Sequence, residues 1–276
     1  MQLRATSLDD AAADALKTSS SWSLAGHFER ALILSSDRDG AMVSVVRHDV
    51  PDGPYTVRLD RSAPLDLRTV ETVPQLDVAS ARRWSVAPVT PGEAVDGTEL
   101  TRRLLLLDLI GERASGRGRG WSVAIPVDDL DGLETALSTD DRRMGEDVAA
   151  RIAGLGPGLT PSGDDLLAGA LAFHAWAEAA GHVENGGSLR AAISEAAVPH
   201  TTRLAGQLLR AAARGHVAAP VAALLSSIFR RGGTFPPDLA PVLAIGETSG
   251  ADLLAGIRLA ARAQRPRRAV RERALA

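Results

Sequence analysis

The segment with the clearest chemical potential is a loop rich in glycine and proline that precedes an apolar run. Residues 154–165 read Gly-Leu-Gly-Pro-Gly-Leu-Thr-Pro-Ser-Gly-Asp-Asp. Glycine and proline fix a tight backbone path, and the apolar residues from Leu166 onward predict a helix directly after it. Free backbone N–H groups at the positive end of a helix suit an anion. We therefore predict that a small anionic ligand binds at Gly156, Gly158, Thr160, Ser162 and Gly163.

Two carboxylates, Asp164 and Asp165, close this segment and are the candidate catalytic residues. The spacing Gly158-x-x-x-x-Gly163 matches the phosphate loop of nucleotide hydrolases, but that motif continues with lysine and serine or threonine. Because two carboxylates repel a bare phosphate, a nucleoside triphosphate pocket of that type is excluded. Asp164 has three candidate roles: holding Mg²⁺ with its waters, binding the amide or ammonium end of a ligand, or acting as a general base. Mg²⁺ is accordingly the one candidate cofactor.

An internal repeat helps to separate structural residues from functional ones. Ser162–Gly169 recurs as Ser249–Gly256, with seven of eight positions identical. We expect two helices that pack together, with the glycine that ends each copy allowing a close approach. The serine and the last aspartate of each copy form the pattern of a capping box. Asp164 corresponds to Ala251, so Asp164→Ala should leave the fold intact, whereas Asp165→Ala should cost about 1 kcal/mol.

His200 and Thr201 complete the predicted ligand-binding set, because they follow Pro199 at a predicted helix start that could face the loop. His174 lies among apolar residues and is interpreted as a core histidine. The sequence contains neither H-E-x-x-H nor G-x-S-x-G, which argues against a zinc peptidase and an α/β-hydrolase. No nucleophile–base pair stands out along the chain.

The elements that must position these residues change character along the chain. Between residues 28 and 89, short valine-rich runs separated by Asp-Gly and Pro-Asp-Gly-Pro turns predict hairpins or a meander. A helix is expected over 99–113, then a glycine-rich loop at 114–120 and an extended run at 121–127. From Asp128 onward the apolar spacing predicts helices. This order is typical of an α+β fold, with a β-rich N-terminal domain over 1–127 and a helical domain over 128–276.

Composition narrows the function classes. Of 276 residues, 45% are hydrophobic and 24% are charged, which is typical of a globular protein. The longest apolar stretch has eight residues, far fewer than the ~20 of a membrane-spanning helix, so no membrane partner is expected. A formal net charge of −3 argues against nucleic acid, and the absence of cysteine excludes disulfides and thiolate chemistry. We expect a cytoplasmic protein.

The run Gly154–Gly169, GLGPGLTPSGDDLLAG, resembles the signature of the AllH-like family. The β-rich first part, the helical second part, the helix start at Thr201-Thr202 and the late turn at Gly246–Gly250 fit the same family. The resemblance implies a subunit of oxamate carbamoyltransferase in allantoin and purine catabolism. That transferase splits oxalurate with phosphate to give oxamate and carbamoyl phosphate. The resemblance also implies protein partners, namely an FdrA-like subunit of acyl-CoA-synthetase type and one further subunit.

Two function hypotheses remain open at this stage. In the first, the chain is a carbamoyltransferase subunit that binds oxalurate, oxamate or carbamoyl phosphate at the glycine-rich loop. These ligands are small anions with amide or ureido N–H groups, which suit a backbone anion site beside a carboxylate. In the second, the chain is a non-catalytic metabolite-binding or scaffolding protein. The lack of an evident nucleophile–base pair favours the second hypothesis unless partner subunits complete the site.

Overall fold

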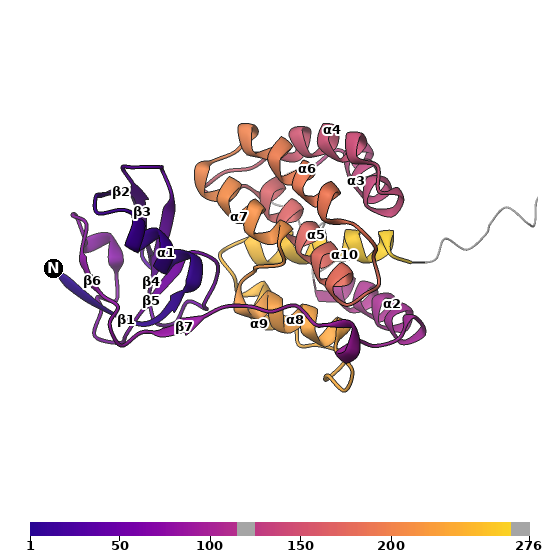
Figure 1. Ribbon diagram of the computed structural model, residues 1–276, viewed down its shortest axis with the longest axis horizontal. Helices are drawn as coiled ribbons and strands as arrows, with labels where there is room; N and C mark the ends of the chain where they lie inside the picture. Colours follow the sequence, from indigo (N-terminus) through magenta and orange to yellow (C-terminus); the bar gives the residue numbers. More distant parts are fainter. Residues whose placement is uncertain (115–124, 266–276) are drawn as a thin grey trace, which may run out of the picture.

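Residues 1–114 and 125–265 are described by the computed structural model, in which a β-sheet region precedes a helical region (Figure 1). This order confirms the predicted α+β class. Most of the glycine-rich loop predicted at 114–120, and most of the extended run predicted at 121–127, lie outside the described residues. Within the described residues, no helix is long and apolar enough to cross a membrane.

The N-terminal sheet has the strand order β2-β3-β4-β5-β1-β6, and β7 also pairs with β1. Two antiparallel hairpin pairings join β2 to β3 and β3 to β4, whereas β4 and β5 run parallel. The strands in the described residues are β1 (Gln2–Asp9), β2 (Trp22–His27), β3 (Ala31–Ser36), β4 (Met42–Val46), β5 (Thr56–Leu59), β6 (Gln75–Asp77) and β7 (Arg82–Trp84). The valine-rich runs predicted between residues 28 and 89 include β4 and β5.

Strand β3 shows how the sheet connects its own core to the helical region. Leu32 and Leu34 pack in the sheet core, which includes Ala12 of helix α1 (Asp10–Thr18). Ile33 points to the opposite face, as alternation along a strand requires, and packs with Leu204 of the helical region. The sheet therefore has apolar side chains on both faces, and its second face meets the helices.

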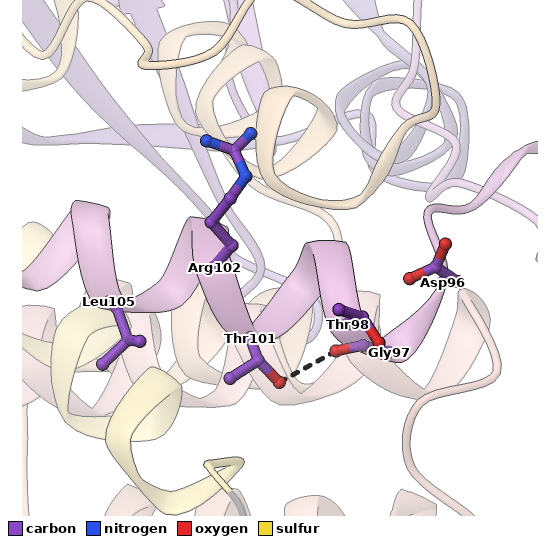
Figure 2. A pocket seen from close by; sticks show the side chains of 6 residues that line it. All are labelled: Asp96, Gly97, Thr98, Thr101, Arg102 and Leu105. Atoms are coloured by element: carbon purple, nitrogen blue, oxygen red, sulfur yellow. Dashed lines mark hydrogen bonds between the residues drawn. The ribbon is translucent and has the colours of Figure 1, made fainter.

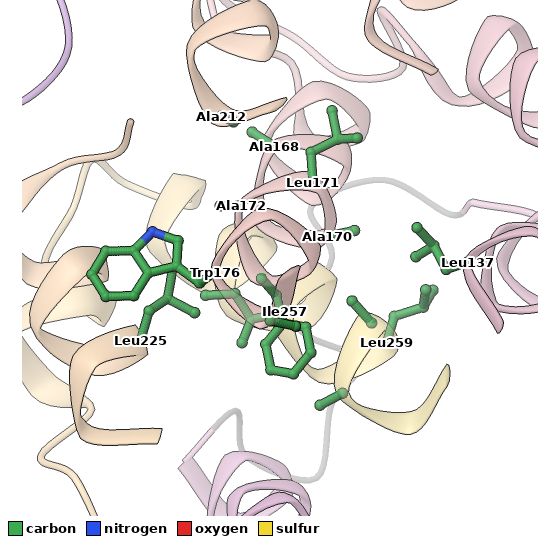
Figure 3. Close-up of a cluster of buried hydrophobic side chains, with 14 of the residues drawn as sticks. Leu137, Ala168, Ala170, Leu171, Ala172, Trp176, Ala212, Leu225, Ile257 and Leu259 are labelled. Atoms are coloured by element: carbon green, nitrogen blue, oxygen red, sulfur yellow. The ribbon is translucent and has the colours of Figure 1, made fainter. Parts of the chain in front are cut away.

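The helices form a second, larger core around α5. In the described residues they are α2 (Gly97–Ala114), α3 (Val127–Thr139), α4 (Arg142–Ile152), α5 (Ser162–Ala179), α6 (Gly187–Ala197), α7 (Arg203–Ala213), α8 (Ala219–Phe229), α9 (Ala240–Leu243) and α10 (Ser249–Ala263). Helix α5 is buried from Ser162 to Ala177, as expected of a helix that is apolar on all sides. Figure 3 shows its side chains facing Leu137 of α3, Leu225 of α8 and Ile257 of α10.

The repeated sequences form α5 and α10, which pack against each other as predicted. A Cβ atom at Gly169 would lie 2.1 Å from the carbonyl oxygen of Leu253, and one at Gly256 would lie 1.9 Å from that of Leu166. Both distances are too short for any side chain. The two glycines therefore set the closest approach of the helices in a nearly symmetric way.

Helix α2 packs with the helical region, although the predicted division at 127 assigns it to the N-terminal domain. Its residues Leu100, Leu104 and Leu107 share one apolar cluster with α5 and α10, and Val89 belongs to the same cluster. Because residues 86–114 pack with the helices, we propose a boundary between the two domains near residue 85 rather than at 127. The described residues 125–265 complete the helical domain.

Candidate functional site

The glycine-rich loop connects α4 to α5 and depends on left-handed backbone conformations. Gly154, Gly156 and Gly158 have φ angles of +73°, +120° and +94°, which residues with a Cβ rarely adopt. The side chain of Leu159 packs in the apolar cluster with Ile33 of the sheet. The glycines thus determine the backbone path of the loop, and Leu159 attaches the loop to the N-terminal sheet.

Several backbone N–H groups of this loop have no hydrogen-bond acceptor among the described residues. They belong to Gly156, Gly158, Leu159 and Thr160, all of which are half-buried or exposed. Gly163 differs, since its N–H donates to the carbonyl oxygen of Leu155 at 2.9 Å. The loop therefore offers donors before the helix begins, and a small anion can reach them.

Asp164 fixes the loop in place. Its side chain is 2% exposed and accepts the N–H of Gly154 at 3.3 Å and the Thr201 hydroxyl at 2.5 Å. Burial raises the pKa of Asp164, and the hydrogen bonds from Thr201 and Gly154 oppose that rise. The expectation that Asp164→Ala leaves the fold intact does not fit these contacts, because the carboxylate joins three segments of the chain.

Asp165 reaches the other copy of the repeat instead of capping its own helix. It accepts a hydrogen bond from the Ser249 hydroxyl. Burial raises the pKa of Asp165 to about 7, the hydrogen bond from Ser249 lowers it, and the nearby charges of Asp252 and Asp164 raise it. One carboxylate oxygen of Asp165 is buried without a hydrogen-bond partner in the described residues.

The predicted capping boxes are wrong for a local reason. Pro161 and Thr248 occupy the N-cap positions of α5 and α10, and neither makes a side-chain capping bond. The backbone N–H groups of Asp164 and Asp165 donate to the carbonyl oxygen of Pro161 at 2.9 and 3.1 Å. With the helix starting at Ser162, the Asp165 carboxylate is free to turn toward Ser249.

A short chain of polar groups runs from the loop to Asp165. The Thr160 and Ser249 hydroxyl oxygens lie 3.4 Å apart, and Ser249 donates to Asp165. Thr160 and Ser249 are half-buried, whereas Asp165 is 8% exposed. A hydroxyl beside a carboxylate whose pKa lies near neutrality can pass a proton in either direction. Sequence reasoning missed this pair because it gave Ser249 only a capping role.

The segment 200–202 holds both ends of the loop. A Cβ atom at Gly154 would lie 2.2 Å from the carbonyl oxygen of His200, so the two backbones touch. The Thr202 hydroxyl donates to the carbonyl oxygen of Leu159 at 2.6 Å and also caps α7. The helix start at His200 and Thr201 therefore does face the loop. Thr201 contributes its side chain, whereas the His200 side chain is exposed.

Other candidates lie apart from this site or have structural contacts. The part of the chain that the structure describes contains no group of three or more acidic or histidine side chains that could hold a metal. His174 is 2% exposed beside Arg190, and burial together with that positive charge lowers its pKa to about 4. It is a neutral core histidine at pH 7. Ser162 is buried in the first turn of α5.

A cavity of about 830 Å³ lies along α2, away from the predicted site residues (Figure 2). Thr101 there donates its hydroxyl to the carbonyl oxygen of Gly97 at 2.8 Å, and Arg102 is paired with Glu99. Thr101 and Arg102, two of the polar side chains that line this cavity, are thus already engaged. The glycine-rich loop remains the better candidate for chemistry.

These features define an α+β protein in which a glycine-rich backbone loop, with N–H groups unpaired among the described residues, lies beside a buried carboxylate. The family model described as oxamate carbamoyltransferase subunit AllH matches residues 152–261, which include the loop, both copies of the repeat and the segment 200–202. Over these residues the chain is similar to the AllH family, which confirms the resemblance seen in the sequence. No curated protein and no solved structure matches the chain.

Proposed function

We propose that this protein is the subunit of an oxamate carbamoyltransferase-type assembly that binds the small anionic substrate. The proposed ligand is oxalurate, oxamate or carbamoyl phosphate, and the proposed site is the loop 154–160. The observation that carries the proposal is the set of four backbone N–H groups without acceptors, at Gly156, Gly158, Leu159 and Thr160. The family match over residues 152–261 supports the choice of ligand.

The neighbouring groups suit the chemistry of such a transfer. When phosphate attacks the carbamoyl carbon of oxalurate, the bond to the oxamate nitrogen breaks and that nitrogen takes up a proton. Because burial raises the pKa of Asp165 to about 7, this carboxyl group can hold and release a proton near neutral pH. Ser249 lies between this carboxyl group and Thr160 of the loop. We assign Ser249 and Asp165 the transfer of this proton, and Asp164 the positioning of the loop.

A subunit of such an assembly has protein partners, and we propose an FdrA-like subunit as one of them. The partner would supply what the described residues lack, including any metal ligands. The alternative, a non-catalytic metabolite-binding or scaffolding subunit, shares the anion site but assigns no proton transfer to Ser249. The two alternatives therefore differ in the effect of Ser249→Ala on turnover.

Calorimetric titration with phosphate, carbamoyl phosphate, oxamate and oxalurate tests the anion site. A ligand at 100 times its dissociation constant should also stabilise the protein by about 2.7 kcal/mol. Gly158→Ala should abolish binding, because φ of +94° strains any residue with a Cβ. Gly97→Ala is the matched control, since nothing lies within 4 Å of its Cβ position. Equal binding by wild type and Gly158→Ala would reject the loop as the site.

Turnover by the reconstituted assembly separates the two alternatives. Ser249→Ala should bind the anion as wild type does and lower the rate by about a hundredfold or more, the usual size of a proton-transfer contribution. An unchanged rate with unchanged binding would favour the scaffolding role.

A further inference from the structure

A second cavity lies where the sheet meets the helical domain. Its volume is about 840 Å³, it is open to solvent on one side, and it is lined by the turn between β3 and β4 and by α7. Thr201, whose hydroxyl donates to Asp164, is part of its wall. The cavity is therefore adjacent to the segment that holds the glycine-rich loop, but it contains none of the loop residues.

Three arginines give this cavity its charge. Arg203 and Arg210 stand seven residues apart on α7 and share one face, and Arg38 extends from the turn. Arg210 forms two hydrogen bonds with Glu195, at 2.7 and 2.6 Å. Arg38 donates to the carbonyl oxygen of Thr18 at 2.8 Å. These two guanidinium groups are thus already held by the protein.

Arg203 is different. Among the described residues its guanidinium group has no hydrogen-bond acceptor and no carboxylate partner, although it lines the cavity. A Cβ atom at Gly40 would lie 3.2 Å from one terminal nitrogen of Arg203. The glycine, with φ of +71°, therefore leaves room for this side chain beside the turn.

The acidic residues of the cavity do not neutralise Arg203. The Asp37 carboxylate accepts the Ser21 hydroxyl at 2.5 Å. Asp39 accepts the N–H of Ala41 at 3.1 Å, and a hydrogen bond from Ser36 is the largest cause of its lowered pKa. Both carboxylates hold the turn in shape. In addition, Arg203 is the first residue of α7, at the positive end of that helix.

We propose that this cavity is a second anion site, in which the Arg203 guanidinium group binds the carboxylate or phosphate of a small molecule. The planar guanidinium group presents paired N–H donors that match two oxygens of either anion. The site is independent of the loop site, since the two share no residue. Thr201 lines the cavity and also donates to Asp164, which positions the loop.

Calorimetric titration with inorganic phosphate, and separately with oxalate, tests the proposal and distinguishes the two kinds of anion. Wild type should bind one of these probes at two sites. Arg203→Gln should weaken the cavity site by about tenfold or more, because it removes a charge-assisted pair. Gly158→Ala should remove the loop site and leave the cavity site intact. Arg214→Gln is the matched control, because Arg214 ends the same helix, is exposed and does not line the cavity.

Two results would overturn the proposal. One is that Arg203→Gln binds both probes as wild type does, or that Arg214→Gln weakens binding as much. The other is that wild type has a single site that Gly158→Ala removes, which would leave the loop site valid and the cavity without a ligand. Loss of both sites in Gly158→Ala with retention of both in Arg203→Gln would likewise reject the cavity.

Discussion

The two copies of the repeat have similar helix packing but differ in the segment that precedes each helix. A Cβ atom at Gly163 would lie 2.0 Å from the carbonyl oxygen of Ile152, at the end of α4. At Gly250 it would lie 2.0 Å from that of Val242, in α9. Each copy thus starts its helix against the end of the preceding one.

The connections themselves are unequal. Residues 153–161 join α4 to α5, whereas the shorter segment 244–248 joins α9 to α10. The extra residues form the glycine-rich loop, and Asp164 fastens that loop to Thr201. Ala251, the counterpart of Asp164, has no such loop to hold. The comparison teaches that the shared residues build the helix pair and bring Ser249 to Asp165, while the residues present in one copy alone build the glycine-rich loop.

Substitution of the glycines that let the two repeat helices meet should cause the largest loss of stability. Gly169→Ala and Gly256→Ala should each destabilise the protein by about 3 kcal/mol or more, since backbone atoms within 2.1 Å cannot yield cheaply. Urea unfolding followed by circular dichroism measures this loss, and failure to accumulate folded protein is its extreme form. Gly97→Ala should remain within about 0.5 kcal/mol of wild type. Tolerance of either substitution would contradict the close helix contact.

The next effect concerns the residue that differs between the copies. Asp164→Ala should lower the free energy of unfolding by about 2 kcal/mol, because it leaves the Gly154 N–H and the Thr201 hydroxyl without their partner. Thr201→Val should lower it by about 1 kcal/mol. The double variant should lose less than the sum of the two, since both remove one interaction. Additive losses would mean that Asp164 and Thr201 stabilise the protein independently, which would contradict their hydrogen bond.

A separate effect is expected in the pH dependence of stability. Asp165 has a folded-state pKa of about 7 against an ordinary value of 3.8, so the folded protein keeps a proton that the unfolded chain releases between these values. Stability should therefore fall as pH rises through this window, with a slope of up to about 1.4 kcal/mol per pH unit. Asp165→Asn should flatten the dependence and be the more stable protein at pH 8. Asp131→Asn, an exposed change on α3, controls for the lost charge. An unaltered slope in Asp165→Asn would contradict the raised pKa.

The smallest change in stability is expected in the loop. Gly158→Ala meets no atom within 4 Å, so its cost is the strain of a left-handed conformation, about 1 kcal/mol. Thermal unfolding should show a modest shift while anion binding is lost. A shift as large as that of Gly169→Ala would mean that the loop supports the fold rather than a ligand.

Much of the fold could be predicted from the chain. The change from β-type runs to helical spacing gives the α+β order, and the repeated glycine predicts the contact of α5 with α10. Strand β1 was missed because Ala5 and Ser7 occupy two of its buried positions, so hydrophobic alternation is weak. The sequence does not show which core the leucines of α2 join, and the proposed boundary near residue 85 rests on that packing.

The site could be predicted only where glycine and proline residues determine the backbone conformation. Glycines and prolines identify the loop, and Pro199 indicates the helix start that brings Thr201 to Asp164. The cross-helix bond from Ser249 to Asp165 could not be predicted, because it depends on how two distant helices cross. The capping pattern of the sequence was misleading for the same reason, since the carboxylate found a partner in the other copy.

A backbone amide NMR titration of the wild-type protein with oxamate tests the central claim most directly. The signals of Gly156, Gly158, Leu159 and Thr160 should shift in a saturable manner, because their N–H groups become donors to the anion. The signals of residues 244–248, the corresponding segment of the second copy, should stay in place. Shifts of equal size in both segments, or none at 156–160 at saturating oxamate, would contradict the assignment of the anion site to the first copy.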